Sequence, residues 1–138
     1  MRRQRRNGHK PTTKASVRRA PLKPLLLRVR DALACIAKSY GDPGLSLSSV
    51  AKQAGFSRWH LCRMLRLTTG IGFAEQLRRT RLKTAARMLG KAALRVKEIA
   101  FAAGYKHVSS FDRDFRGRYG RTPSEFRLRA GPGRGDRV

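Results

Sequence analysis

Two pairs of arginines stand at the spacing that places side chains on one face of a helix. Arg63 and Arg66 are three residues apart, and Arg113 and Arg116 repeat the same interval further along the chain. A guanidinium group presents a planar fork of N–H donors, which matches the O6 and N7 acceptors of guanine and also pairs with phosphate. The spacing therefore predicts two basic helix faces suited to a nucleic acid, with Arg63 and Arg113 as the guanine-contacting residues.

The neighbours of these arginines complete two candidate DNA-contacting faces. Apolar residues recur on the opposite side of each expected helix, at Leu61 and Leu65 in the first and at Phe111 and Phe115 in the second. Trp59 lies on the arginine side, away from Leu61, which favours contact with a base or sugar over a place in the core. The predicted DNA-binding residues are Arg58, Trp59, Cys62, Arg63, Arg66, Val108, Ser109, Asp112, Arg113 and Arg116.

Asp112 is the one acidic member of this set. Phosphate repels a carboxylate in a groove, so two interpretations remain for it: it accepts a hydrogen bond from cytosine N4, or it pairs with Arg116 one turn on and orients that side chain. We favour the pairing with Arg116.

Each basic face is expected to follow a shorter helix that ends at a glycine. Val96, Ile99 and Ala103 have helical spacing, and Gly104 stands where the chain must turn, because glycine tolerates a left-handed backbone. A helix, a tight turn and a helix with a basic outer face form the helix-turn-helix pattern. The pattern occurs twice: Val50, Ala51, Ala54, Gly55 and Phe56 recur 49 residues later, and Leu61, Arg63, Leu65, Arg66 and Gly70 recur 50 residues later.

The doubled pattern resembles the DNA-binding domain of the AraC/XylS family of bacterial transcription regulators. The motifs that carry the resemblance are Ile-Ala-xxx-Gly-Tyr at 99–105, Phe-x-Arg-x-Phe at 111–115 and Gly-x-Thr-Pro-Ser-Glu-Phe-Arg at 120–127. The resemblance implies an all-α fold of two helix-turn-helix units joined by a long linker helix, each unit placing a helix in the major groove. It sets Trp59 and Arg63 where family members contact bases, whereas Cys62 replaces a longer polar residue.

Three segments are expected along the chain. Residues 1–23 hold nine Lys or Arg and no acid, and are expected to be a basic arm that is disordered when free. Two interpretations of the arm remain open. It lies along DNA, or it is a solubilising tail or the product of a misassigned start codon. Residues 24–129 form the AraC-type DNA-binding domain, with a first helix from Pro24 or Leu25, helix-turn-helix motifs at about 46–70 and 95–120, and a linker helix at about 73–90; residues 130–138 form a flexible tail.

Composition limits the functional classes. The chain has 33 Lys and Arg against 8 Asp and Glu, a formal charge of +25, which points to a polyanion: nucleic acid first, an anionic membrane second. Two cysteines make neither a disulfide framework nor a zinc site, and no apolar run is long enough for a membrane span. The three histidines lack partners at catalytic or ligand spacing. We therefore expect no enzyme, no cofactor, no metal and no membrane partner, and a cytoplasmic, nucleoid-associated protein.

The function expected from these observations is sequence-specific binding of double-stranded DNA by a transcription regulator. At 138 residues we expect no room for a separate effector domain, so the resemblance implies a stand-alone family member, of the kind that acts as a monomer and recruits RNA polymerase as an activator. The alternative is a nonspecific architectural DNA- or RNA-binding basic protein. Two adjacent major-groove segments on one face of the DNA lie about 34 Å apart, and a closer pair of recognition helices requires the DNA to bend.

Overall fold

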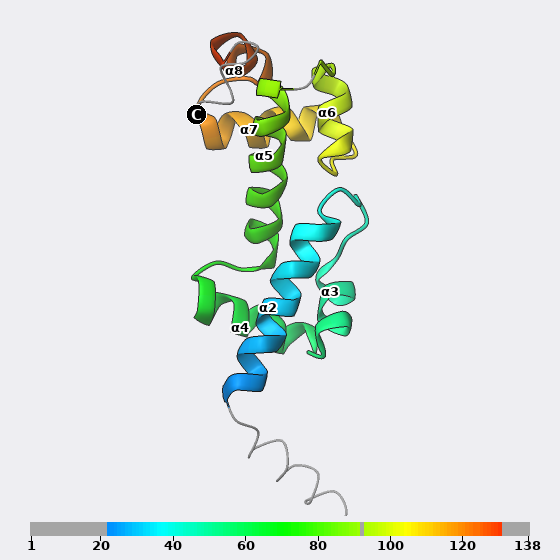
Figure 1. Cartoon of the computed structure of the whole chain (residues 1–138), viewed down its shortest axis with the longest axis vertical. Coiled ribbons are helices and arrows are strands. Elements are labelled where there is room, and N and C mark those ends of the chain that lie inside the picture. Colours follow the sequence, from blue (N-terminus) through cyan, green and yellow to red (C-terminus); the bar gives the residue numbers. More distant parts are fainter. Residues whose placement is uncertain (1–21, 92, 131–138) are drawn as a thin grey trace, which may run out of the picture.

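The computed structural model describes residues 22–91 and 93–130, and these residues are helical and connected by short turns, with no strand among them (Figure 1). The predicted all-α class is confirmed. Most of the predicted basic arm and the predicted tail lie outside the described residues. The first helix begins at Leu22, two residues before the predicted start, so Leu22 and Lys23 belong to it and not to the arm. The helices are α2 (Leu22–Ser39), α3 (Leu47–Ala54), α4 (Arg58–Thr69), α5 (Phe73–Lys91), α6 (Val96–Ala102), α7 (Val108–Tyr119) and α8 (Pro123–Ala130).

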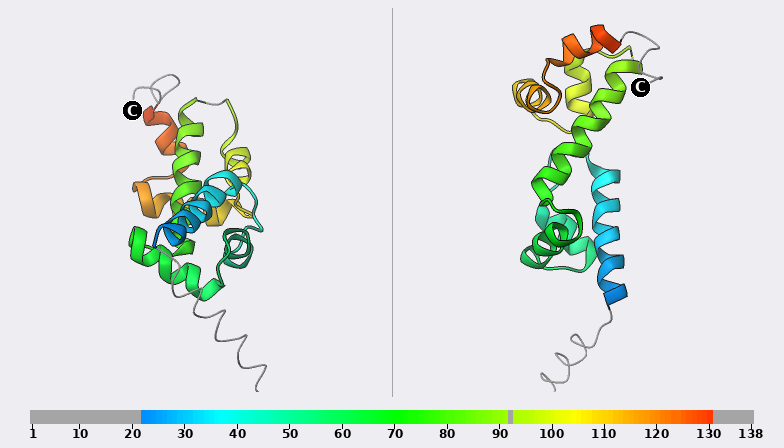
Figure 2. Two further views of the ribbon diagram at one scale, coloured as in Figure 1. Left: turned by 60° about the horizontal axis from the view of Figure 1, so that its bottom comes forward. Right: turned by 90° about the vertical axis from the view of Figure 1, so that its left-hand side faces the viewer.

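Two separate hydrophobic cores divide the molecule into two units. The first unit packs α2, α3 and α4 around Ile36, Val50 and Leu61, together with Leu77 from the start of α5. The second unit packs α6, α7 and the rest of α5 around Ile99, Phe111, Phe115 and Leu82, and Phe126 of α8 closes it. Figure 2 shows the units following one another along the length of the molecule, with α5 running from one into the other. The long linker helix thus contributes buried residues to both hydrophobic cores.

Serine hydroxyls begin the helices of the first motif. The Oγ of Ser46 accepts a hydrogen bond from the N–H of Ser49, and the Oγ of Ser57 accepts one from the N–H of His60. Such caps satisfy N–H groups that have no partner within a helix. In the second motif His107 occupies the position before α7 and makes no side-chain cap. The second motif is held instead by its larger aromatic core.

The two motifs close their first helices with the same hydrogen bonds. In the first, the N–H of Phe56 donates to Ala51 and that of Gly55 to Lys52; in the second, the N–H of Tyr105 donates to Ala100 and that of Gly104 to Phe101. Both are the Schellman arrangement of a helix C-terminus, which needs a left-handed residue. Gly55 has φ +80° and Gly104 has φ +99°. The sequence repeat is therefore a repeat of backbone geometry, and the additional residue of the second copy falls in the turn before α7.

Candidate nucleic-acid interface

The predicted DNA-binding residues occupy matching positions on α4 and α7, the second helices of the two motifs. Seven of the ten are exposed, and three are half-buried: Cys62, Val108 and Asp112. Val108 packs against the second core, so its role in the structure is at least partly that of a core residue. The two helices thus each present an arginine-bearing outer face while their other face fills a core.

On α4, Trp59 and Arg63 form one unit of the surface. The Trp59 side chain is 70% exposed, which is far more than an indole shows in a core. The guanidinium carbon of Arg63 lies 5.5 Å from the centre of the indole ring, a cation–π contact between residues one helical turn apart. This contact restricts the Arg63 side chain and leaves its N–H donors available. The pair therefore presents the flat apolar face of an indole beside the hydrogen-bond donors of a guanidinium group.

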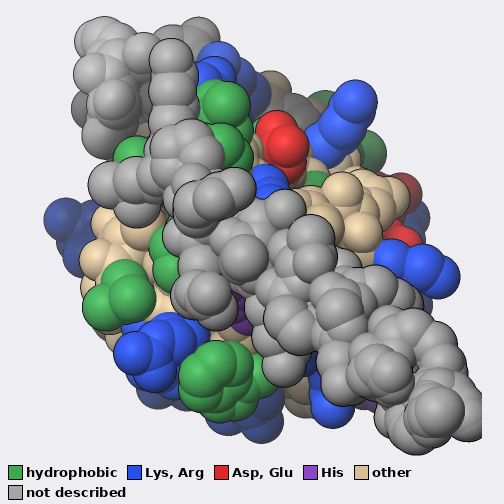
Figure 3. All heavy atoms as spheres, turned by 90° about the horizontal axis from the view of Figure 1, so that it is seen from below, with side chains coloured by type: hydrophobic (Ala, Val, Ile, Leu, Met, Phe, Trp, Pro, Cys, Tyr) green, Lys and Arg blue, Asp and Glu red, His purple; other side chains and the backbone are tan. Residues whose placement is uncertain are grey.

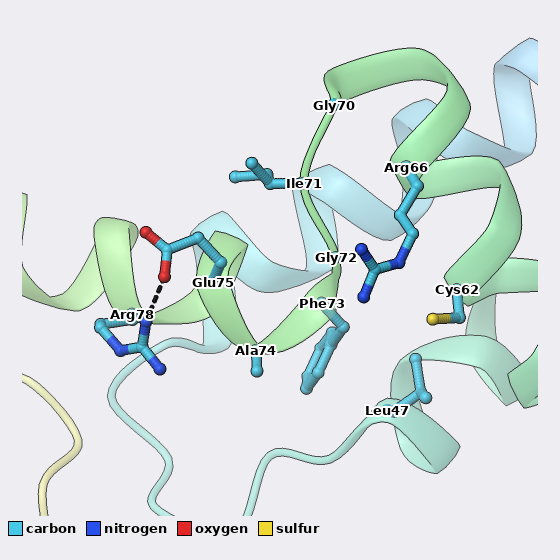
Figure 4. A pocket seen from close by; sticks show the side chains of 10 residues that line it. All are labelled: Leu47, Cys62, Arg66, Gly70, Ile71, Gly72, Phe73, Ala74, Glu75 and Arg78. Atoms are coloured by element: carbon cyan, nitrogen blue, oxygen red, sulfur yellow. Dashed lines mark hydrogen bonds and ion pairs between the residues drawn. The ribbon is translucent and has the colours of Figure 1, made fainter.

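Cys62 and Arg66 line a hollow between α4 and the start of α5. Figure 4 shows the Cys62 sulfur pointing toward Phe73 and Leu47, and the Arg66 guanidinium lying beside Gly72. A Cβ built on Gly72 would lie 3.2 Å from an Arg66 terminal nitrogen, so the guanidinium rests against this turn. Both side chains therefore turn partly toward the next helix instead of pointing straight away from α4.

On α7 the second arginine face has a different chemistry. The Arg113 side chain is 76% exposed, and its Nε lies 3.6 Å from Oδ1 of Asp114. Oδ2 of Asp114 accepts a hydrogen bond of 3.0 Å from the Tyr105 hydroxyl and lies 3.7 Å from Nε of Arg78 on the linker helix. Burial raises the pKa of the Tyr105 phenol, and the hydrogen bond to Asp114 raises it further, so the phenol remains a donor.

Asp114 is a residue beside the predicted site that the sequence analysis did not single out. It joins the turn of the second motif, the recognition helix and the linker helix through one carboxylate. The available signal was a second acid on α7, next to Arg113 and two residues after Asp112. Only the folded chain brings Tyr105 and Arg78 to it.

The predicted pairing of Asp112 with Arg116 is wrong: among the described residues no ion pair joins them. The charge of Arg116 acts instead on Glu125 at the start of α8 and helps to lower the pKa of that carboxyl group; the main cause of the lowering is the hydrogen bond from the Thr122 N–H. Asp112 lies half-buried in a shallow hollow with Ser109, Arg113 and Arg116.

One end of the molecule is mainly basic where its described residues can be seen. The end of the molecule at which α2 begins shows Lys and Arg side chains on several sides and few acidic ones (Figure 3). No group of His, Cys, Asp or Glu in the part of the chain that the structure describes could hold a metal ion. In the same part, no helix is both long and apolar enough to cross a membrane. The arrangement offers donors and cations for a polyanion.

Comparison with known proteins finds transcription regulators that contain a helix-turn-helix domain. A family model described as a helix-turn-helix domain matches residues 50–129. The regulatory protein SoxS of Escherichia coli is 36% identical over 101 residues, which are 73% of this chain and 94% of SoxS. The transcriptional activator AarP of Providencia stuartii is 36% identical over 84 residues, which are 61% of this chain and 62% of AarP.

Solved structures agree with the fold. The C-terminal domain of AraT, a response regulator from Geobacillus stearothermophilus, superposes with a TM-score of 0.72 at 32% identity, covering 74% of this chain and 84% of that domain. The DNA-binding domain of AdpA, solved in complex with a target DNA, gives a TM-score of 0.71 at 22% identity, covering 74% of this chain and 91% of that one. At that identity the second match bears on the fold alone.

Proposed function

The chain belongs to the AraC-type helix-turn-helix family of transcription regulators, and from this premise we propose that it reads one specific duplex site through two adjacent segments of the major groove. In this proposal α4 enters one segment and α7 the next. Arg63 and Arg113 hydrogen-bond to guanine, and Trp59 contacts a base or sugar next to Arg63.

The observation that carries the proposal is the matched exposure of the two recognition helices. Arg63 and Arg113 occupy the same position on α4 and α7, both point away from a buried core, and one linker helix belongs to both cores. A nonspecific basic protein needs positive charge but has no need for two equivalent donor forks on equivalent helices. This duplication favours sequence reading over an architectural role.

The two faces differ in ways that predict an asymmetric site. Arg63 is stacked on Trp59, whereas the matching position beside Arg113 is Ser109, and Asp112 replaces Cys62. Palindromic operators mirror a protein dimer with two-fold symmetry. A single chain with two unlike recognition helices needs no second copy, so we propose a monomer on a site whose two halves are unrelated in sequence.

Activation of transcription and contact with RNA polymerase are further parts of the proposal. AarP is named as an activator and SoxS as a regulatory protein, and the matched regions cover most of SoxS. A regulator that binds chromosomal sites works in the cytoplasm at the nucleoid. If α4 and α7 are closer than one helical turn of straight DNA, binding bends the duplex at a cost of about 1–6 kcal/mol, which the second set of groove contacts must offset.

Selection of bound duplexes from a random pool tests the proposal. We expect one enriched site with two short conserved blocks of different sequence, separated by about one helical turn. The same site should give one footprint that survives an excess of bulk genomic DNA. Enrichment without any common sequence, together with a footprint lost to bulk DNA, would instead establish the nonspecific architectural protein.

A further inference from the structure

The two units touch away from the linker helix, at the loop that follows α2. This loop lies next to the turn between α6 and α7, as Figure 1 shows beside the middle of the molecule. A Cβ built on Gly41 would lie 3.1 Å from the main-chain oxygen of Ala102, and one built on Gly104 would lie 2.2 Å from that of Tyr40. The end of the first helix therefore meets the turn of the second motif backbone against backbone.

Arg81 of the linker helix binds this loop from the other side. Its Nε donates a hydrogen bond of 2.9 Å to the main-chain oxygen of Tyr40, and its Nη2 donates one of 2.9 Å to that of Asp42. Both carbonyls lie just beyond the C-terminus of α2, where the helix dipole stabilises a cation, and the Asp42 oxygen also accepts a hydrogen bond from the Leu45 N–H. The same guanidinium lies 5.9 Å from the centre of the Tyr105 ring in the second motif. One side chain thus contacts the loop of the first unit and the turn of the second.

Arg81 is less exposed than the other Lys and Arg side chains of the linker helix. Its side chain is half-buried, and burial lowers the pKa of the guanidinium, while Tyr105 and Asp42 favour the charged form. Arg87, on the same helix, is exposed and has no contact of this kind in the described part of the chain. Because the donors of Arg81 are already engaged by main-chain oxygens, Arg81 is poorly placed to bind a phosphate.

We propose that the contact of Arg81 with the loop at Tyr40 and Asp42, packed on Gly104, fixes the orientation of the two recognition helices and so sets the spacing between the two halves of the DNA site. The role of Arg81 is positioning, and it rests on the proposed two-groove function. A single helix between two units resists stretching but permits bending and twisting, whereas a second attachment off the helix axis opposes both. One added base pair moves a half-site by about 3.4 Å and turns it by about 35°, which a rigid pair of units cannot follow.

The first arm of the test needs no DNA. Spin labels are placed on Lys52→Cys of α3 and Lys97→Cys of α6, both exposed positions, in a chain carrying Cys35→Ala and Cys62→Ala. The distribution of distances between the labels is measured by pulsed electron resonance. We expect a narrow distribution with Arg81 present, a broad one in Arg81→Met, and a narrow one in the matched control Arg87→Met, which loses the same charge from the same helix.

The second arm uses duplexes in which the spacing between the two halves of the selected site is changed by one base pair. We expect the native chain and Arg87→Met to lose affinity by about tenfold or more on the altered spacing, and Arg81→Met to lose less than about threefold because its units can adjust. Arg81→Lys keeps the charge and can donate to one carbonyl only, so it should fall between them. If Arg81→Met does not unfold cooperatively and so is not properly folded, Arg81→Lys is compared with the native chain in its place.

The outcomes separate this inference from the function on which it rests. If Arg81→Met and Arg81→Lys match Arg87→Met in both distance distribution and spacing preference, the positioning role is overturned and the two-groove function stands. If the native chain shows no spacing preference at all, the two-groove function fails, and with it the spacing role, whatever the distances between the labels.

Discussion

Gly104 lies directly against the main-chain carbonyl of Tyr40, so closely that a Cβ on Gly104 would lie 2.2 Å from the oxygen. Gly55, its equivalent in the first motif, has open space by comparison: a Cβ there would meet only Cδ of Arg28, at 3.6 Å. Both glycines have a left-handed backbone. The two turns therefore have the same backbone conformation but different neighbours. A substitution at Gly55 tests the strain of the left-handed backbone alone, whereas one at Gly104 also tests the contact between the two units.

Gly104→Ala should destabilise the protein much more than Gly55→Ala. The left-handed backbone alone costs an L residue about 1–2 kcal/mol, and this is the expected loss at Gly55. At Gly104 overlap with the Tyr40 carbonyl adds overpacking of about 1–3 kcal/mol, for a total near 2–5 kcal/mol. Denaturant unfolding of the two variants gives the comparison. Equal losses in both would show that the carbonyl of Tyr40 is not held against Gly104 in solution.

Arg63→Ala and Arg113→Ala should each weaken binding to the selected site by about 1–3 kcal/mol and relax base preference in separate halves of it. Lys83→Ala serves as the control, because Lys83 is an exposed cation of the linker helix and lies on neither recognition helix. The measurement is site selection with each variant, followed by titration on native and altered duplexes. Loss of preference at the same base pairs in both arginine variants contradicts the assignment of one groove segment to each helix.

Glu125→Gln should reduce stability at neutral pH and progressively less in acid. Hydrogen bonds from the Thr122 N–H and hydroxyl are the main causes that lower the pKa of Glu125 from its ordinary 4.5. Because the folded-state pKa lies below the unfolded one, the carboxylate stabilises the fold above about pH 4.5, and this contribution disappears as the pH falls through the folded-state pKa.

Thermal melts of both chains from pH 7 downward test this dependence. Asp31→Asn is the matched control, since it removes an exposed carboxylate from within α2, away from any helix N-terminus. A difference between native and Glu125→Gln that stays constant below pH 4.5 would rule out the capping carboxylate as its source.

Deletion of residues 1–21, which stops short of α2, should weaken DNA binding without changing the preferred site. The eight cations of this segment carry no sequence information if they neutralise phosphates. Each lost phosphate contact should lower the magnitude of the slope of log K against log salt by about 0.9. Salt titrations of both chains on specific and random duplex measure this slope. Equal slopes would assign the arm to solubility or another partner, and a changed site preference would assign it to reading of the minor groove.

The sequence by itself determined the local structure of both motifs. Apolar residues at helical spacing, glycines at the turns and serines before α3 and α4 specify helix faces and ends through contacts a few residues apart, and such contacts are visible in the order of residues. The repeat added the equivalence of Arg63 and Arg113 and hence the two matching exposed faces. The all-α class and the family followed from the same local patterns.

The tertiary structure decided what the exposed side chains do and how the units are joined. Arg66 rests against the turn before α5, Asp112 does not pair with Arg116, and Asp114 contacts Tyr105, Arg113 and Arg78. The hydrogen bonds of Arg81 to Tyr40 and Asp42 join positions about forty residues apart in the chain. The partner of a long, flexible side chain depends on which groups the fold brings near it. Every residue has a main-chain carbonyl, so a hydrogen bond from an arginine to a carbonyl leaves no pattern in the sequence.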